Sequence, residues 1–466
     1  MKSNRNKSKI IIFVVLLLSI SLGYAFINSD LKLSGIATVT KQRWNVYFDN
    51  LVVTEGSVTP VTAASLSGEY PTTVAYSVSL EKPGDYYEFT VDAVNSGSID
   101  AMVDMVSITD DGNPISLPSY IEYKVEKING HGIEEGDILL ANDTKKYKVR
   151  VYFKQDIEKE ELENIEPLNL KLKFEVVYAQ ATKEDLPKAT SFATDDWKTI
   201  AYEGEKAAKQ TSVTNNKCGA YNVGDTKTIQ MDADNNGTPE EYTLRIANCS
   251  TPAICSTPGF SQTACGFVVE FTGLISYQQY NPQQSNDTIN GYSNRGGWKY
   301  SHLRAYLNGG VYLKDDPTNE IDYRDNGIID FLPNDLRNSI IPTIAVSGHG
   351  SKDTENFTST DKLYLLSTHE IWEDDDEDPS SGIDYRDTAY SNTRQLDYYE
   401  GLGVTVRNKS GADKISASGY SFRWWTRSVN IVNSSYCFRV DEGGGASPST
   451  SSTSNAGVSP AFRLAN

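Results

Sequence analysis

The stretch most suggestive of catalysis is His369-Glu370-Ile371-Trp372-Glu373. It differs only at its last position from the H-E-x-x-H helix of zinc proteases, in which two histidines one turn apart bind zinc and the glutamate activates water. Glu373 stands where the second histidine would be, and no third ligand can be assigned. We therefore interpret the stretch as structural, with a metal-dependent hydrolase as the alternative.

A second pattern, of oxygen ligands, lies at Asp232, Asp234 and Asn236 and is followed by Gly237. Alternating oxygen side chains with a glycine at the sharp turn are typical of the start of a calcium loop. The twelfth position holds Thr243 in place of a glutamate that would bind through both oxygens. Since the stretch lies between two expected strands, we favour a polar hairpin turn, and Ca²⁺ at these residues is the alternative.

The chain has five cysteines, which are too few for a scaffold built on disulfides. Their spacing does not match the short C-x2–4-C pairs of structural zinc sites. Outside the cytoplasm, one or two local disulfides are the expected outcome, and free thiols are the alternative. The candidates are Cys218, Cys249, Cys255 and Cys265, whereas Cys437 stands alone.

Other patterns argue against catalysis and against nucleic acid as a partner. The chain has no G-x-S-x-G turn and no phosphate-binding P-loop. Gly348-His349-Gly350-Ser351 is interpreted as a turn, because no acid at a recognisable spacing orients the histidine.

Residues 373–378 are acidic and are interpreted as a solvated loop. With 62 acidic and 43 basic residues, the net charge of −19 repels nucleic acid phosphates.

The first element expected along the chain is an N-terminal leader. Residues 1–28 combine a basic start with an apolar run from Ile10 to Phe26, which predicts a signal peptide or a membrane anchor. Gly23 and Ala25 supply small residues for cleavage. The rest of the chain is expected to be extracellular or at the cell surface, with membrane contact only through this segment.

Residues 29–180 are expected to form an all-β sandwich. Apolar and polar residues alternate with period two, which is the pattern of strands buried on one face. The charged residues 156–166 are the one expected insertion. Strands are predicted at residues 44–53, 86–94, 102–108, 147–153 and 168–176.

Residues 181–215 lose this alternation and are predicted to be a linker. Residues 216–466 mix expected strands with helices and long loops, which indicates an α+β domain. Strands are expected at residues 223–231, 241–246 and 266–271, and helices at residues 303–307 and 332–340. The chain is therefore expected to be a multidomain protein.

The N-terminal half resembles the camelysin and TasA-type group of exported bacterial surface and biofilm-matrix proteins. The resemblance is carried by the leader end Leu22-Gly23-Tyr24-Ala25, by Pro83-Gly84-Asp85 with the following residues 89–98, and by the strand at residues 170–178. It implies a jelly-roll-like sandwich at the cell envelope or in the matrix. Camelysin is described as a protease, but no metal-ligand pattern falls in this half.

The C-terminal half resembles a family of uncharacterised domains of bacterial surface proteins, similar in pattern to C-type-lectin-like and formylglycine-generating-enzyme-like folds. The formylglycine activity needs a reactive cysteine pair, and only Cys437 lies in the corresponding stretch. In lectin-like folds the surface between the tryptophan motif and the final strand contacts the ligand. The motifs are Gly296-Gly297-Trp298, residues 303–308, 332–336, 361–367, 424–428 and 457–464. The ligand contacts implied are Trp424, Trp425, Arg427, Asn433, Tyr436, Arg439 and Asp441.

These patterns together predict an exported surface or matrix protein without catalysis, whose C-terminal domain binds a carbohydrate or a protein. No cofactor is expected apart from the calcium alternative. A metal-dependent envelope hydrolase and a purely structural, fibre-forming matrix protein are the two other hypotheses.

Overall fold

The computed structural model describes residues 43–465 except residues 70, 111–112, 115–116, 129, 158–167, 283–293, 313–319, 377–381 and 417–418. The leader or anchor predicted at residues 1–28 lies outside the described residues, as does most of the insertion predicted at residues 156–166. Within the described ranges, no helix has the length and apolar character needed to cross a lipid bilayer.

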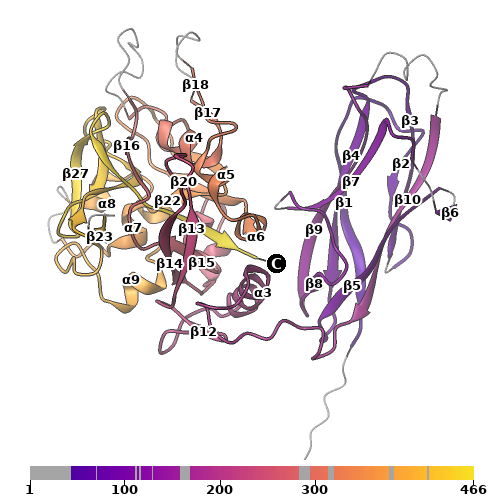
Figure 1. Ribbon diagram of the computed structural model, residues 1–466, viewed down its shortest axis with the longest axis horizontal. Coiled ribbons are helices and arrows are strands. Elements are labelled where there is room, and N and C mark those ends of the chain that lie inside the picture. Colours follow the sequence, from indigo (N-terminus) through magenta and orange to yellow (C-terminus); the bar gives the residue numbers. More distant parts are fainter. Residues whose placement is uncertain are drawn as a thin grey trace, which may run out of the picture. The chain divides into compact units, whose positions relative to one another are not determined.

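The first region consists of two antiparallel sheets (Figure 1). One has the order β1 (Val46–Gly56), β4 (Tyr86–Asn95), β9 (Asp143–Phe153) and β7 (Ile121–Lys127). The other has the order β2 (Thr62–Ser65), β3 (Thr73–Leu80), β10 (Leu168–Gln180), β5 (Ala101–Asp110) and β6 (Asn113–Pro114), with β8 (Ile138–Leu139) paired to β5.

The core of this sandwich is formed by apolar side chains that alternate with polar ones along the strands. On β9 the buried residues are Tyr147, Val149, Val151 and Phe153, and every second residue between them is more exposed. On β10 the alternating Leu172, Phe174 and Val176 are buried in the same core. Phe174 stacks on Phe48 of the other sheet, with ring centroids 5.6 Å apart. The predicted β-rich fold is confirmed, because apolar side chains at this spacing all point to one face of each sheet.

The second region contains two larger sheets and several two-stranded ribbons. One large sheet has the order β13 (Thr226–Met231), β14 (Glu240–Asn248), β15 (Val268–Phe271), β29 (Pro460–Leu464) and β19 (Ile340–Ile341), with β22 (Tyr364–Leu365) also paired to β29. The other has the order β16 (Ser276–Gln279), β28 (Asn455–Val458), β25 (Trp424–Val429), β26 (Tyr436–Val440) and β27 (Ala446–Ser451). The ribbons pair β11 (Lys217–Cys218) with β12 (Tyr221–Asn222), β17 (Val311–Tyr312) with β18 (Ile321–Asp322), β20 (Thr343–Ser347) with β21 (Phe357–Asp361), and β23 (Lys414–Ile415) with β24 (Ser421–Phe422).

Short helices surround these sheets. The hydroxyl of Ser301 accepts a hydrogen bond from the Arg304 backbone N–H at the start of α4, which ends at Gly309 in the left-handed conformation. The helices predicted near residues 303–307 and 332–340 correspond to α4 and α6. The helices are α3 (Trp197–Ala207), α4 (His302–Asn308), α5 (Ile328–Phe331), α6 (Asn334–Ser339), α7 (Thr368–Ile371), α8 (Ile383–Arg386) and α9 (Asp397–Gly401), with 3-10 turns η1 (Ala253–Ser256), η2 (Gln262–Ala264) and η4 (Tyr390–Asn392).

Residues 181–215, predicted to be a linker, include part of the core of the second region. Phe192 packs against Trp197 and Tyr221, with ring centroids 6.2 and 5.8 Å apart. These residues and Ile200 belong to the core of the second region. The side chain of Asp196 caps α3 by accepting from the Thr199 backbone. The second core therefore begins near residue 192, because an amphipathic helix follows a stretch whose composition resembles a connector.

Candidate functional site

The tryptophan pair predicted to contact a ligand lies inside the protein. Trp424 and Trp425 begin β25, and neither side chain has exposed surface. Successive side chains of a strand point to opposite faces, and here both faces are covered. The ring of Tyr280 lies 5.7 Å from that of Trp425, and the Trp424 indole donates to the Ala412 carbonyl. The prediction that these two indoles contact a ligand is wrong.

Arg427, the third implied contact on this strand, is equally buried and forms an ion pair with Glu370. Its two terminal nitrogens lie 2.5 and 2.6 Å from the two carboxylate oxygens. The carboxylate also accepts from the hydroxyls of Thr263 and Thr393 and from the Ser367 backbone. Burial alone would raise the pKa of Glu370, but the Arg427 guanidinium outweighs it and the pKa lies below its ordinary value. Arg427 is therefore a core residue, and its assignment as a surface contact is wrong.

In the part of the chain that the structure describes, the stretch similar to the zinc-protease helix does not assemble a metal site. Its helix α7 has only four residues. His369 stacks on the ring of Tyr390 at 4.0 Å, and its Nδ1 lies 2.8 Å from the Tyr390 carbonyl, which can only accept. Its Nε2 lies 3.4 Å from Glu373. Glu370 is held by Arg427, so the histidine and this glutamate serve separate structural roles.

A second buried charge cluster surrounds Glu270 on β15. Arg245 and Lys414 lie 2.6 and 2.7 Å from its two oxygens, and Tyr399 donates a hydrogen bond to it. Burial raises the pKa of Glu270, but Arg245 and Lys414 reverse this and lower it to about 2. Burial also lowers the pKa of Lys414 to about 8, although Glu270 opposes that shift. Lys414 also donates to the Ser459 hydroxyl, and Glu270, Lys414 and Ser459 are all buried.

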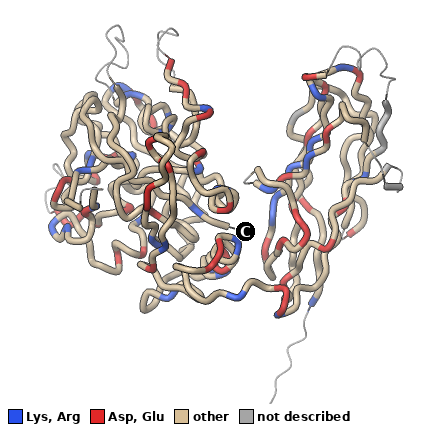
Figure 2. Tube along the Cα trace, in the orientation of Figure 1, with Lys and Arg blue, Asp and Glu red and all other residues tan. Residues whose placement is uncertain are grey.

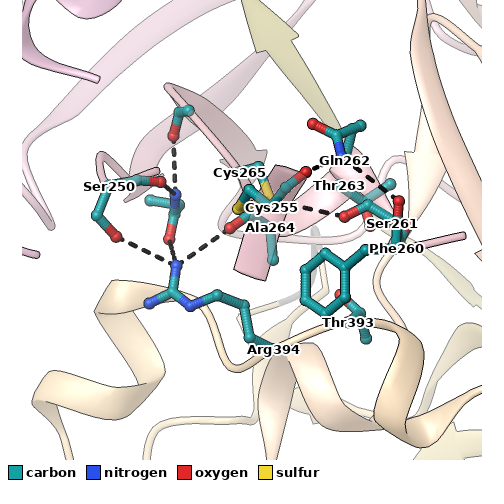
Figure 3. Close-up of a disulfide and its surroundings, with 12 residues drawn as sticks. Ser250, Cys255, Phe260, Ser261, Gln262, Thr263, Ala264, Cys265, Thr393 and Arg394 are labelled. Carbon is teal, nitrogen blue, oxygen red and sulfur yellow. Dashed lines mark hydrogen bonds between the residues drawn. A yellow bond between two sulfur atoms is a disulfide. The ribbon is translucent and has the colours of Figure 1, made fainter. Parts of the chain in front are cut away.

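The structure joins the four clustered cysteines in two disulfides, Cys218–Cys249 and Cys255–Cys265. The second bond closes a short loop that includes Thr263, one of the donors to Glu370. Figure 3 shows this disulfide beside Arg394, whose guanidinium donates to the Ala264 carbonyl within the same loop. The disulfide therefore constrains the loop that lines the buried ion pair.

Cys437 is the free cysteine of the described chain and is fully buried. Burial raises the pKa of its thiol well above the ordinary value. A thiol that stays protonated is a poor nucleophile, so Cys437 is suited to packing and not to chemistry.

The predicted calcium residues lie in the hairpin loop between β13 and β14. Asp232 accepts hydrogen bonds from the backbones of Asn236 and Gly237, and Asp234 accepts from the Asn236 backbone and side chain. Carboxylate oxygens of Asp232, Asp234 and Glu240 lie within 4.8 Å of one another. Glu240, which the sequence did not single out, thus lies close to the two predicted aspartates. The bonds to the loop backbone fit a polar turn, and calcium stays a prediction.

The other four implied ligand contacts lie at or near the surface. Asn433 is exposed in the turn before β26, and Tyr436, Arg439 and Asp441 are partly exposed. Asp441 accepts hydrogen bonds from two glycine backbones of the next turn and so shapes the loop. Burial and the nearby Arg423 lower the pKa of Arg439. These four residues remain available to a ligand.

A cleft that the sequence did not single out lies beside α4. Its volume is about 560 Å³, within the range of small-molecule sites. Charges of both signs are interspersed along the described chain (Figure 2), but the charged residues that line this cleft are all cationic among those that the structure describes. They are Lys299, Arg304 and Lys362. Arg304 and Lys362 belong to two of the motifs behind the C-terminal resemblance, and Lys299 directly follows a third. Spacing could not reveal the cleft, because residues 299–311 and 342–362 meet only in the fold.

The fold and these sites define a multidomain β-rich protein whose second region is organised around buried ion pairs. A family model described as DUF6273, a domain of unknown function, matches residues 273–466. No curated protein matches the chain. β15 ends before the matched segment but pairs with β29 near its end. The second region is therefore larger than the matched domain.

Proposed function

We propose that this chain is an exported bacterial cell-surface or extracellular-matrix protein that binds a ligand through its C-terminal domain and catalyses no reaction. The sandwich fits the jelly-roll-like module implied by the camelysin and TasA-type resemblance, and the second region fits a C-type-lectin-like domain. Residues 1–28 serve as the export signal or anchor. The partner is a carbohydrate or a protein at the cell surface.

The observation that carries the proposal is the position of Glu370. A general base must reach the proton that it abstracts. Glu370 has no exposed surface, and both its oxygens are bonded to Arg427. Glu270 is enclosed in the same way by Arg245 and Lys414. Glu270 and Glu370 thus form ion pairs inside the second region and serve its fold. The surface of the region is left free for binding.

The turns after β25 and β26 support a binding role. Asn433 and Arg439 lie on a hairpin whose base is anchored by the buried indoles of β25. Surface loops held by a rigid scaffold are the usual carriers of ligand contacts. The volume of the cleft beside α4 also suits a small ligand.

The test is a binding screen of the full chain against glycans and cell-envelope fractions, combined with protease and metal assays. We expect binding to at least one surface component and no hydrolysis. The His369→Ala variant is the control, since it should bind as the unmodified chain does. Absence of binding, or hydrolysis that the His369→Ala substitution abolishes, would refute the proposal and favour the hydrolase hypothesis.

A structural, fibre-forming role is the second candidate, and one feature of the sandwich favours it. Among the described strands, β1 is an edge strand of 11 residues that pairs with β4 alone, and it exposes Val52 and Val53. Exposed apolar edges can pair with another chain. However, the β1–β4 register is broken after Asp49 and again after Val53, and such irregularities weaken pairing. Electron microscopy of the secreted protein distinguishes the two roles, because only the structural role requires fibres.

A further inference from the structure

The cleft beside α4 contains positive charge that the described protein does not neutralise. Lys299 and Lys362 line it, and neither ammonium group has an ion-pair partner among the described residues. Among the described residues, the Lys299 ammonium contacts one ring, that of Tyr300, whose centroid is 5.4 Å away. No described residue lining the cleft is acidic. In a chain of net charge −19, such a grouping indicates a site for an anion.

The charge of Lys362 is expected to lower the stability of the fold. Burial lowers the pKa of its ammonium, and the nearby Arg337 lowers it further. A partly buried charge without a counter-charge disfavours folding unless a ligand supplies the missing charge. Groups perturbed in this way are more common at functional sites than elsewhere.

The third cation gives the cleft a rigid wall. Arg304 Nε lies 2.5 Å from Asp361 Oδ1. Asp361 Oδ2 in turn accepts from the Trp298 indole and the Ser359 hydroxyl, and this carboxylate is buried. Its oxygens are therefore engaged inside the protein and do not neutralise the two lysines. The wall of the cleft is held in place before any ligand arrives.

Tyr300 adds a flat aromatic surface at the same cleft. Its side chain is 61% exposed, which is unusual for a large ring. Its ring meets Phe357 edge-on at 6.0 Å, so it is supported on one side. A supported, exposed ring offers an apolar face together with a hydroxyl, which suits a ligand that has both apolar and polar surfaces.

The backbone around the cleft disfavours an extended peptide as the ligand. Peptides that bind beside a strand depend on free backbone groups at its edge. Here the Thr360 carbonyl accepts from Arg304, and the Lys362 and Leu363 N–H groups donate to Asn308. Recognition must therefore rely on the side-chain charges and the aromatic ring.

We propose that this cleft binds a carboxylate-bearing saccharide, with Lys299 and Lys362 pairing with its carboxylates and Tyr300 packing against a sugar ring. The inference rests on the proposed function and deepens it, because it assigns the ligand class and the place where the ligand binds. A saccharide supplies the flat C–H face for the tyrosine, and its carboxylate supplies the charge that the lysines lack.

The test measures binding of oligogalacturonate to the full chain by calorimetry at low salt, with dextran oligomers and poly-L-glutamate as comparison ligands. We expect oligogalacturonate to bind best. The double variant Lys299→Gln/Lys362→Gln should weaken binding at least tenfold, and Tyr300→Ala should weaken it several-fold while Tyr300→Phe does not. Lys217→Gln is the matched control, since Lys217 is exposed on β11 and does not line the cleft.

Thermal unfolding of the same variants excludes misfolding as the cause of lost binding. Lys362→Gln should unfold at the same temperature or a higher one, because it removes an uncompensated charge. The proposal is overturned if oligogalacturonate does not bind, if the double variant binds it unchanged, or if dextran or poly-L-glutamate binds equally well. A partner from the surface screen that the double variant still binds would refute this inference and leave the proposed function intact.

Discussion

The two regions of the described chain build their cores in different ways. The sandwich buries alternating apolar side chains such as Val78, Phe89 and Val149. The second region also buries aromatic residues, but it fully encloses charged ones such as Glu270, Glu370 and Arg427. An apolar core tolerates exchange of residues of similar volume, whereas a buried charge needs one specific partner. Stability in the second region therefore depends on a few exact pairings.

The largest effect is expected from Arg427→Met. This change leaves Glu370 buried without its counter-charge, which should lower the free energy of unfolding of the second region by about 3–5 kcal/mol. Denaturation followed by tryptophan fluorescence measures it, because all tryptophans except Trp44 lie in this region. Unfolding of the sandwich, followed by circular dichroism, is the internal control. Its midpoint denaturant concentration should not change.

A double variant sharpens this prediction. Glu370→Leu/Arg427→Met should be more stable than Arg427→Met alone, because it removes the unpaired carboxylate. Equal stability of the single and double variants would contradict a role for the ion pair itself.

Removal of the Cys255–Cys265 disulfide should have the next largest effect. The bond closes a loop over a sequence separation of 10 residues, and loss of such a link typically costs about 2–4 kcal/mol. We expect Cys255→Ser/Cys265→Ser to destabilise the second region by this amount, measured by fluorescence. The Cys437→Ser variant keeps both disulfides and controls for substitution of a buried cysteine. A double variant as stable as the unmodified chain would contradict the prediction.

Acid should weaken the second region through Glu270. Its pKa is about 2 in the folded chain and about 4.5 ordinarily. A carboxylate with a lowered folded pKa stabilises the fold fully above the unfolded value, and this contribution is lost as the pH falls from about 4.5 to about 2. We expect the fluorescence melting temperature to fall in that range. The Glu270→Gln variant should melt at a lower temperature near neutral pH, and its melting temperature should fall less on acidification. If the melting temperature of this variant depended on pH as that of the unmodified chain does, the lowered pKa of Glu270 would be contradicted.

The smallest effect is expected at a charge pair of the sandwich. Lys146 lies 3.1 Å from Asp92 and is 42% exposed. Exposed pairs contribute about 0–1 kcal/mol, so Lys146→Met should change the free energy of unfolding of the sandwich by no more than that. Denaturation followed by circular dichroism measures it. A loss as large as that of Arg427→Met would remove the contrast between the regions.

The sandwich was predictable because its pattern is local. Alternation at residues 147–153 and 168–176 predicts strands with one buried face. In the structure β9 buries every second residue from Tyr147 to Phe153, and β10 buries Leu172, Phe174 and Val176. The clustering of four cysteines predicted one or two local disulfides, but their spacing did not predict which cysteines pair. The burial of Phe192 within the predicted linker could not be predicted from the local pattern, because it depends on Tyr221, which follows in another element.

The candidate sites of the second region were less predictable. Alternation along β25 implies that at least one of Trp424 and Trp425 is buried, but burial of both depends on Tyr280, which is distant in sequence. Arg427 and Glu370 belong to separate motifs, so their pairing appears only in three dimensions. The cleft residues Lys299 and Lys362 are likewise brought together only by the fold.

The position of β29 has a consequence for when the second region can form. This strand lies between β15 and β19 in its sheet and also pairs with β22. It is contributed by residues 460–464, so the ribosome must finish nearly the whole region before its sheet can close. The strands of both sandwich sheets end by residue 180, so these sheets can form earlier. A chain interrupted before residue 460 would carry a folded sandwich and an unclosed second sheet with exposed strand edges, which is a target for proteases and aggregation.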